Sequence, residues 1–384
     1  MIYLDNTATT YPKPSCVPEE ISRCIKNYCG NPGRGSHQLS IMSAQVISKT
    51  RSLLGEMFNC DSENVVFTYN TTYALNLAIK SLIEPDSHVL ISDIEHNSVL
   101  RPVAALARLG ICSYSIFNSC GNDETILCNI IERLKTNTKM LICTHLSNVG
   151  CRRLPIKKIG NLCKLNNIKF IVDGAQSAGV YEIDVKNMNI NALCIPGHKG
   201  LYGPQGIGMI LFNDVEIINS IIEGGTGILS KEVKMPSFLP EGLEAGTIST
   251  PSIAGLFSSL NWLKSIGMNR IQQHEEDLYK YLVERLKIKD YVTLYEMNKY
   301  PGNTLMFNID KIDSSQIANC LNDVGICVRS GYHCSPLAHK SLNTPNGGAI
   351  RVGFGVFNTR RDIDFLCNSL DEIYLKSKKT TDKD

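Results

Sequence analysis

Short apolar runs alternate with amphipathic segments along most of the chain. Runs rich in apolar residues predict buried strands, and segments in which apolar residues recur every three or four positions predict helices. The predicted strands are residues 64–68, 88–92, 140–144, 167–173, 192–196 and 209–212, and the predicted helices are residues 18–28, 40–58, 73–82, 99–109, 156–165 and 252–266. This alternation favours an α/β fold with a mostly parallel, doubly wound sheet.

The pattern changes after the helix that ends near residue 266. Two helices (270–286 and 314–324) and short strands (291–295, 303–308, 327–329 and one that begins at Arg351) predict a smaller α+β domain. The chain of 384 residues is long enough for two domains. We expect residues 15–255 to form the large domain and residues 1–14 with 256–384 to form the small one. Residues 3–12 are predicted to be an ordered arm outside any helix or strand, and the charged tail 376–384 is predicted to be frayed.

Composition narrows the range of partners and compartments. The net charge of +2 indicates no field that would attract nucleic acid or an anionic membrane. No apolar run is long enough to span a bilayer, and no secretory signal is visible at the N-terminus. The 15 cysteines are odd in number and contain no Cys-x-x-Cys pair, so neither a disulfide framework nor a zinc site is favoured. We expect a cytoplasmic protein without a metal, in which Cys143, Cys163 and Cys194 are small buried hydrophobic residues.

Polar residues follow the predicted parallel strands and are expected at one edge of the sheet: Thr71, His96, Asn148, Asp173 and Lys199. A buried lysine loses its proton readily and can form a Schiff base, and a carboxylate suits a protonated pyridine nitrogen. Lys199 and Asp173 therefore describe a site for pyridoxal 5'-phosphate. Either residue alone is more simply a surface lysine or a strand-end cap, but both together, with Gln176 and His198 beside them, favour the cofactor site.

Two other segments have a functional and a plain interpretation. Thr71 and Thr72 begin a helix after a strand, where hydroxyls and free N–H groups suit a phosphate, although capping alone would explain one threonine. The loop 30–37 carries Arg34 and His37, and it is equally well interpreted as a turn or as a lid.

Cys334 stands apart from the other cysteines because it lies in a Gly/Pro-bounded polar loop, residues 331–336. We expect this thiol to be exposed, with His333 and Arg329 favouring its thiolate form. The alternative is a loop cysteine without a role. Arg351 can grip a substrate carboxylate in bidentate fashion, although taken alone it is more simply a solvated charge at a strand end.

With these residues assembled, the chain resembles the cysteine desulfurases of the class V aminotransferase group, which are fold-type I pyridoxal phosphate enzymes. The resemblance covers nearly the whole length. Four motifs carry it: Asp5-Asn6-x-Ala8-Thr9-Thr10, Asp173-x-x-Gln176, Gly197-His198-Lys199 and Gly331-Tyr332-His333-Cys334. The short loop around Cys334 is similar to that of the group II enzymes, which include selenocysteine lyases.

The resemblance implies a role for each matching residue. Lys199 carries the cofactor, His96 stacks on its ring, and Asp173 pairs with the ring nitrogen. The remaining contacts are implied for Gln176 and Asn148 (ring hydroxyl or substrate), Thr71, Thr72 and His198 (phosphate), Thr247 (phosphate of a neighbouring subunit, hence a homodimer), and Arg351 supported by Arg329 (substrate carboxylate). Cys334 takes the sulfur of L-cysteine as a persulfide, alanine is released, and an acceptor protein or small thiol receives the sulfur.

Three positions depart from the family pattern: Pro196 replaces a phosphate-binding Ser or Thr, Asn70 replaces a glycine, and Cys151-Arg152-Arg153 replaces a Gly-Thr-type stretch. The rival functions are a selenocysteine lyase, an aminotransferase or racemase that needs no loop cysteine, and a non-catalytic scaffold with this fold. The intact set of Lys199, Asp173 and Cys334 counts against the scaffold.

Overall fold

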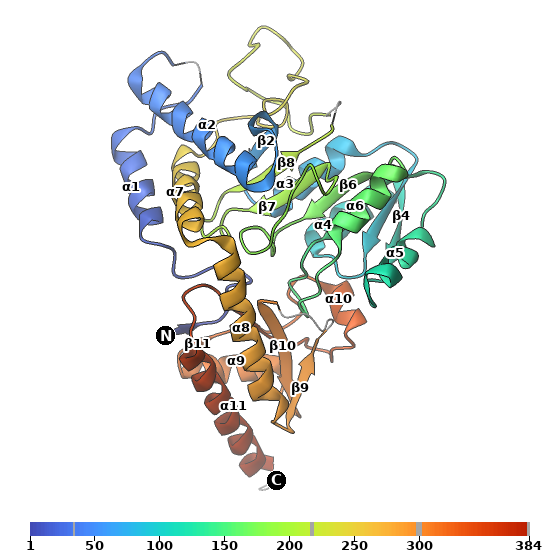
Figure 1. Cartoon of the computed structure of the whole chain (residues 1–384), viewed down its shortest axis with the longest axis vertical. Coiled ribbons are helices and arrows are strands. Elements are labelled where there is room, and N and C mark those ends of the chain that lie inside the picture. The colour runs from blue at the N-terminus through green and yellow to red at the C-terminus, as the bar shows by residue number, and fades with distance from the viewer. Residues whose placement is uncertain (34, 216–218, 297–301, 382–384) are drawn as a thin grey trace. The chain divides into compact units, whose positions relative to one another are not determined.

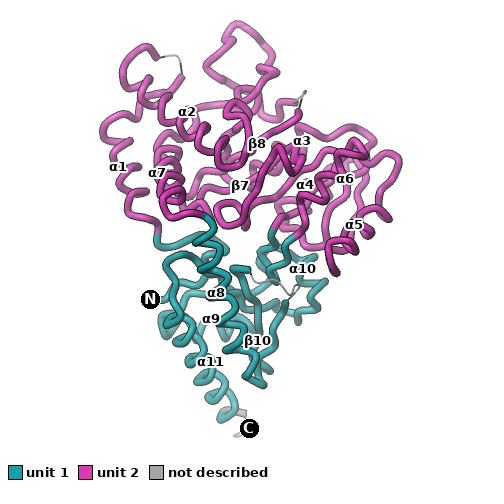
Figure 2. Tube along the Cα trace, viewed as in Figure 1, with its two compact units in different colours: residues 1–12, 146–153, 268–384 teal, residues 13–145, 154–267 magenta. Residues whose placement is uncertain are grey.

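The computed structural model describes residues 1–33, 35–215, 219–296 and 302–381, so Arg34 lies outside the described residues. The chain divides into two compact units, which are coloured separately in Figure 2. We call residues 13–145 with 154–267 the larger unit, and residues 1–12, 146–153 and 268–384 the smaller unit. Compared with the expected domains, helix α7 (Thr250–Ile266) belongs wholly to the larger unit, and the short segment 146–153 belongs to the smaller one.

The larger unit is built on a seven-stranded sheet with the order β2-β8-β7-β6-β5-β3-β4 (Figure 1). Its strands are β2 (Val65–Thr68), β3 (Ser87–Ser92), β4 (Cys112–Phe117), β5 (Thr138–Thr144), β6 (Lys169–Asp173), β7 (Ala192–Pro196) and β8 (Gly208–Phe212). Neighbouring strands from β4 to β7 are parallel, whereas β8 is antiparallel to both β7 and β2. Two antiparallel pairings in succession return β2 to the direction of β7. The carboxyl ends of six strands therefore lie at one edge, as the predicted parallel sheet requires.

Alternating side chains of the strands pack against helices on the two faces of the sheet. Ile171 of β6 belongs to an apolar cluster with residues of α3 (Thr71–Leu82) and α4 (Asn97–Arg108). Its neighbour Phe170 points the other way, toward α6 (Ile156–Leu165), where a Cβ added to Gly160 would lie 3.3 Å from the Phe170 ring. Successive side chains of a strand point to opposite faces, so this strand is buried on both sides and reads as a continuous apolar run.

The remaining helices of the larger unit are α1 (Cys16–Asn27), α2 (Gln38–Phe58) and α5 (Asp123–Ile131), beside α7. Helices α1 and α2 pack against α7 (Figure 1). Capping residues set several of the starts. The Asn70 side chain accepts from the Tyr73 N–H at 2.9 Å and begins α3, and Ser249 with a proline in the first turn begins α7.

The smaller unit contains a three-stranded sheet, β12-β10-β9, and a short parallel pair, β1-β11. Its elements are β1 (Ile2–Tyr3), α8 (Met268–Lys287), β9 (Val292–Tyr295), β10 (Thr304–Ile309), α9 (Ser314–Asp323), β11 (Ile326–Cys327), α10 (Pro336–Ser341), β12 (Ile350–Gly353) and α11 (Arg360–Thr381). Helix α8 packs against α11 and the sheet.

The structure corrects the sequence-based elements in several places. Residues 2–3 form a strand because their backbone groups pair with β11, which no local pattern in a polar arm indicates. Of the tail 376–384 that was predicted to be frayed, residues 376–381 are the last part of α11, whose apolar side chains Ile363, Leu366 and Leu370 are buried, and residues 382–384 lie outside the described residues. Strand β4 and helix α5 were not predicted either.

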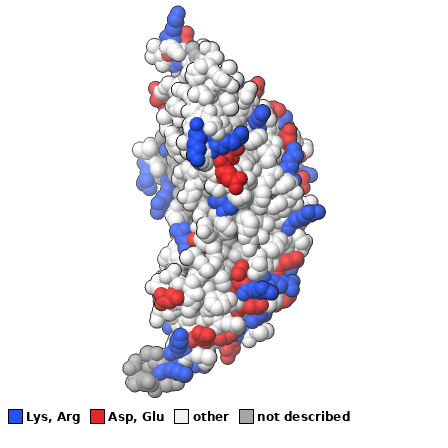
Figure 3. All heavy atoms as spheres, turned by 90° about the vertical axis from the view of Figure 1, so that its left-hand side faces the viewer, with Lys and Arg blue, Asp and Glu red and all other residues white. Residues whose placement is uncertain are grey.

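Burial of the cysteines follows the prediction for three of them. Cys143, Cys163 and Cys194 are at most 1% exposed, and burial raises the pKa of each thiol. Among the described residues, no helix is long and apolar enough to cross a membrane. On the face drawn in Figure 3, basic and acidic side chains are interspersed over a mostly uncharged surface.

Candidate active site

Asp173 and Lys199 follow neighbouring parallel strands of the larger unit. Asp173 ends β6 and is 4% exposed, with the Ala175 N–H donating to its Oδ1 at 2.9 Å. Lys199 follows β7 by three residues. Burial raises the pKa of Asp173, and the positive charge of Lys199 acts in the opposite direction. The predicted amine and carboxylate are therefore close enough to interact electrostatically.

His96 lies at the carboxyl end of β3 and caps helix α4. Its Nδ1 accepts from the Ser98 N–H at 3.1 Å, so in the neutral ring the proton is on Nε2. The Ser98 hydroxyl lies 2.8 Å from the same Nδ1 and 2.7 Å from the Thr72 hydroxyl. A chain of hydroxyls thus connects the first turn of α3 with the ring of His96. The predicted phosphate residue Thr72 and the predicted ring-stacking residue share one network through Ser98, which the sequence analysis did not identify.

Lys13 is a second residue that the sequence analysis missed. Its Nζ donates to the His198 carbonyl oxygen at 2.7 Å, beside Lys199, and burial lowers its pKa to about 7. Burial, reinforced by the charges of Lys199 and Lys13, also lowers the pKa of His198 to about 4. His198 is therefore a neutral hydrogen-bonding ring at pH 7 rather than a cation. No pattern around Lys13, which lies between two prolines, distinguishes it from a loop lysine.

Glu95, next to His96, is a fully buried carboxyl group. The Thr144 N–H donates to its Oε1 at 2.9 Å, and the Ser92 hydroxyl bonds to the same oxygen. Its Oε2 has no hydrogen-bond partner within the described part of the chain. Burial raises the pKa of Glu95 to about 8, so it is protonated at pH 7. The neutral carboxyl group of Glu95, the residue before His96, therefore connects the end of β3 with the end of β5 by hydrogen bonds.

Two further predicted residues of the larger unit are both buried. Gln176, in the turn after β6, is 7% exposed, and Thr71 at the start of α3 is 9% exposed. Both positions are dry, which strengthens any hydrogen bond they make to a ligand.

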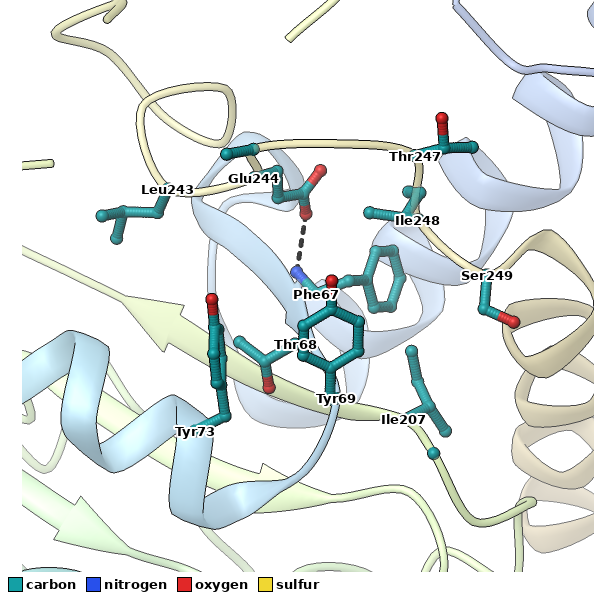
Figure 4. Close-up of a pocket in the computed structure, with 12 residues that line it drawn as sticks. Phe67, Thr68, Tyr69, Tyr73, Ile207, Leu243, Glu244, Thr247, Ile248 and Ser249 are labelled. Atoms are coloured by element: carbon teal, nitrogen blue, oxygen red, sulfur yellow. Dashed lines mark hydrogen bonds between the residues drawn. The ribbon is translucent and has the colours of Figure 1, made fainter. Parts of the chain in front are cut away.

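Thr247 lies on a loop that is fastened to strand β2. Glu244 accepts from the Phe67 N–H at 2.6 Å, drawn as the dashed line in Figure 4, and pairs with Arg51 at 2.7 Å. Thr247 itself is exposed. It lines the pocket drawn in Figure 4, which Phe67 and Glu244 also line, and an adjacent cavity of about 910 Å³. In Figure 4 its hydroxyl points away from the ring of Phe67. Within its own chain the Thr247 side chain is thus free to face another molecule.

Arg351 of strand β12, in the smaller unit, is 2% exposed, which excludes the interpretation as a solvated charge. Its Nη2 donates to Asp5 Oδ1 at 2.9 Å, so the opening motif of the chain supplies its counter-ion. Its Nε has no hydrogen-bond partner within the described part of the chain. Arg329 is exposed and pairs with Arg351 through the backbone, with the Arg351 N–H donating to the Arg329 carbonyl at 2.8 Å.

Cys334 is exposed, as predicted, and its backbone has a left-handed conformation with φ of 58°. The neighbouring His333 is 5% exposed, and burial lowers its pKa to about 2. The expectation that His333 helps the thiolate as a cation is therefore not met, because the ring is neutral. Arg351 is the buried cation near this loop: burial lowers its pKa, while the charge of Asp5 and, less strongly, that of Cys334 act in the opposite direction.

Asn148 lies in the smaller unit, in contact with the Cys334 loop. Its Nδ2 donates to the His333 carbonyl at 2.9 Å, and its Oδ1 accepts from the Ser335 hydroxyl at 2.7 Å. The predicted site residues are thus divided between the units. The larger unit holds Thr71, Thr72, His96, Asp173, Gln176, His198, Lys199 and Thr247, and the smaller unit holds Asn148, Arg329, Cys334 and Arg351. No group of three or more His, Cys, Asp or Glu able to hold a metal ion occurs in the described ranges.

Comparison with known proteins places nearly the whole chain in one group. Residues 2–366 match the family described as Aminotransferase class-V. A protein named "Probable cysteine desulfurase" from Methanothermobacter thermautotrophicus is 30% identical over 97% of this chain and 94% of its own. The protein named "Cysteine desulfurase" from Pectobacterium carotovorum is 28% identical over 97% and 93%.

Solved structures agree with this result. The apo structure of a cysteine desulfurase from Thermococcus onnurineus superimposes with a TM-score of 0.88 at 28% identity and covers 97% of this chain and 94% of that one. A cysteine desulfurase from Escherichia coli superimposes with a TM-score of 0.85 over 96% and 94%, and at 24% identity it supports the fold alone. These neighbours have the fold-type I architecture that the family resemblance implies, with the mostly parallel α/β sheet that the sequence pattern predicts.

Proposed function

We propose, from the premise that this chain belongs to the class V aminotransferase family, that it is a pyridoxal-phosphate-dependent cysteine desulfurase. It converts L-cysteine to L-alanine and holds the sulfur as a persulfide on Cys334. One observation carries the proposal beyond the family: Cys334 is an exposed thiol in a left-handed loop beside the buried cation Arg351. An aminotransferase needs no such thiol, whereas a sulfur carrier needs one that an acceptor can reach.

The residues of the larger unit fit the cofactor. Burial raises the pKa of Asp173, and a protonated pyridine nitrogen is a cation that would stabilise its carboxylate. The hydroxyls and N–H groups that begin α3 and α4 suit a phosphate. Pyridoxal phosphate would be held by the Lys199 amine, by Asp173, by the His96 ring, by Thr71, Thr72, Gln176 and His198, and by Thr247 of a second copy of the chain. When bound, it supplies an electron sink for the substrate α-carbon.

Side chains of the protein itself bind the substrate and remove its proton. Arg351 has an Nε without a hydrogen-bond partner among the described residues and can bind the substrate carboxylate, with Asp5 keeping its guanidinium oriented. The Lys199 amine removes the proton from the substrate α-carbon, and the ring of His198, whose pKa burial lowers to about 4, adds no positive charge beside it.

Cys334 performs the sulfur transfer. Its thiolate attacks the substrate sulfur, so the sulfur–sulfur bond of the persulfide forms as the carbon–sulfur bond breaks. The electron pair of the broken bond stays on the substrate carbon, which takes up a proton and leaves in L-alanine. An acceptor protein or a small thiol then removes the outer sulfur.

The test is to incubate the cofactor-loaded protein with L-cysteine and to measure alanine, sulfide and the masses of its cysteine peptides. We expect equal amounts of alanine and transferable sulfur, with the added sulfur on the peptide that contains Cys334. Alanine without added sulfur on Cys334 would contradict the proposal. L-selenocysteine as a parallel substrate tests the lyase alternative, since a much higher rate on it that does not depend on Cys334 would favour that function.

A further inference from the structure

The segment 146–153 is a buried loop within the smaller unit. Residues 146–152 are all buried, although the segment contains neither a helix nor a strand. Leu146 and Arg153 form an antiparallel bridge, and the Ser147 N–H donates to the Arg152 carbonyl at 2.8 Å. Loops normally lie at the surface because buried backbone groups must find partners. A loop buried in this way has its position determined by what surrounds it.

Cys151 anchors one end of this segment. The thiol is 3% exposed, burial raises its pKa to about 11, and hydrogen bonds from the backbone N–H groups of Thr304 and Asn303 act against this rise. A Cβ added to Gly302 would lie 1.6 Å from the Cys151 sulfur, so only glycine permits this approach. The departure from the family pattern at Cys151 is thus a packing contact against the start of strand β10, and this buried thiol is unsuited to carry sulfur.

Asn148, at the other end of the segment, forms hydrogen bonds with the residues on both sides of Cys334. Its Nδ2 donates to the carbonyl of the residue before the cysteine, His333, at 2.9 Å. Its Oδ1 accepts from the hydroxyl of the residue after it, Ser335, at 2.7 Å. His333 and Ser335 are 5% and 0% exposed, while Cys334 between them is exposed. One amide group therefore fixes both neighbours of the thiol and leaves the thiol accessible.

The backbone at this point needs such support. His333 and Cys334 have φ values of 49° and 58°, a conformation that residues with a Cβ rarely adopt and almost never in succession. Two other contacts assist: His333 Nε2 lies 3.0 Å from the Ala349 carbonyl, and the Ser335 N–H donates to the Tyr332 carbonyl at 2.9 Å. The second of these also spans Cys334, because it closes the turn from Tyr332 to Ser335, and Asn148 adds two side-chain hydrogen bonds across the same turn. Strained backbone that surrounding structure holds in place is typical of functional sites.

We propose that Asn148 is a positioning residue for Cys334, which holds the loop in its left-handed conformation so that the thiol is presented in one place. This inference rests on the proposed function. It differs from the role that the family resemblance implies for Asn148, namely a contact with the cofactor ring or the substrate. The two roles predict different results, because the hydrogen bonds from Asn148 stabilise the loop even when no substrate is present.

The experiment compares Asn148→Ala, Ser335→Ala and the double variant in the cofactor-loaded protein by hydrogen exchange and by steady-state kinetics. Asn148→Ala should speed amide exchange in residues 331–336 about tenfold, because two buried hydrogen bonds are lost. It should lower kcat about tenfold or more and change KM for L-cysteine less than about threefold, because misplacement of a nucleophile mainly affects the chemical step. The absorption spectrum of the cofactor should not change. Ser335→Ala should have a smaller effect in the same direction.

The double variant and a matched control make the test decisive. Because the serine hydroxyl bonds to Asn148, the double variant should exchange no faster than Asn148→Ala alone. Asn358→Ala is the control: Asn358 is 7% exposed in the same unit, donates to the Tyr3 carbonyl at 2.9 Å and accepts from the Gly355 N–H at 2.9 Å. It should leave exchange in residues 331–336 unchanged.

Unchanged exchange in residues 331–336 of Asn148→Ala, additive effects in the double variant, or a shifted cofactor spectrum would each overturn the inference. The exchange measurement needs no turnover. If the wild type releases no alanine from L-cysteine, the proposed function is wrong. The positioning role of Asn148 is still tested by hydrogen exchange in residues 331–336.

Discussion

The two units present their chemistry in opposite ways. In the larger unit, Asp173 and Glu95 stand at the ends of buried strands, and burial shifts their pKa values toward the neutral form. In the smaller unit, Cys334 is exposed, and hydrogen bonds to its two neighbours hold it in place. A cofactor site benefits from dryness, because every charge interaction in it is strengthened. A sulfur carrier must remain reachable, so its order has to come from the loop around it. The four variants below test this contrast, from the largest expected effect to the smallest.

Lys199→Ala should abolish alanine formation from L-cysteine, with a loss of about a thousandfold or more, because the residue is both the anchor of the cofactor and the base. Borohydride treatment of the wild type should attach the cofactor to the Lys199 peptide, as mass spectrometry can show. The exposed Lys49→Ala is the control and should behave as wild type. Attachment to any other lysine would remove Lys199 from this role.

Cys334→Ser should lower the rate of sulfur release from L-cysteine by roughly two orders of magnitude, as expected when a covalent nucleophile is lost. Its cofactor absorbance should match the wild type, because the residues proposed to hold the cofactor belong to the larger unit. The loss on L-selenocysteine should be smaller, since the carbon–selenium bond is weaker. Cys120→Ser, at another exposed cysteine, is the control. A wild-type rate in Cys334→Ser, or a persulfide on Cys327 or Cys151, would contradict the assignment.

Thr247→Ala should weaken cofactor retention about tenfold, the effect of losing one charge-assisted hydrogen bond to a phosphate. Equilibrium dialysis of the cofactor measures this, and light scattering should show a homodimer in both proteins. Thr226→Ala, which lines the same cavity, is a comparison for loss of a hydroxyl nearby. A monomer that keeps its cofactor would rule out a shared site.

Glu95→Gln should change the pH dependence of stability. Burial raises the pKa of Glu95 from about 4.5 to about 8, so the folded state binds a proton that the unfolded state releases between these values. This contribution to stability is complete below the lower pKa and is lost as pH rises through the higher one. The Tm of Glu95→Gln relative to wild type should therefore rise by a few degrees between pH of about 5.5 and 8.5. The exposed Glu132→Gln is the control, and equal slopes for all three proteins would count against a buried neutral acid.

Much of the fold could be predicted from local patterns. Helix α6 has the predicted bounds, and most other helices and strands differ by one to three residues at their ends. The largest element that was not predicted is α11, of 22 residues. Its sequence is rich in charged residues, and the helix is stabilised by burial of a few apolar side chains. Strand β1 could not be predicted because only its pairing with β11, more than 300 residues away in sequence, makes it a strand.

The sequence by itself determined which residue types meet at the sheet edge, because a parallel sheet brings the ends of its strands together. It therefore sufficed for Asp173 and Lys199, and for the exposed Gly/Pro-bounded loop of Cys334. Only the tertiary structure decided that His333 is neutral, that Asp5 pairs with Arg351, that Lys13 bonds to the His198 carbonyl, and that Asn148 brackets Cys334. Burial and contacts between residues distant in sequence set these features, and neither is encoded in any local pattern of the chain.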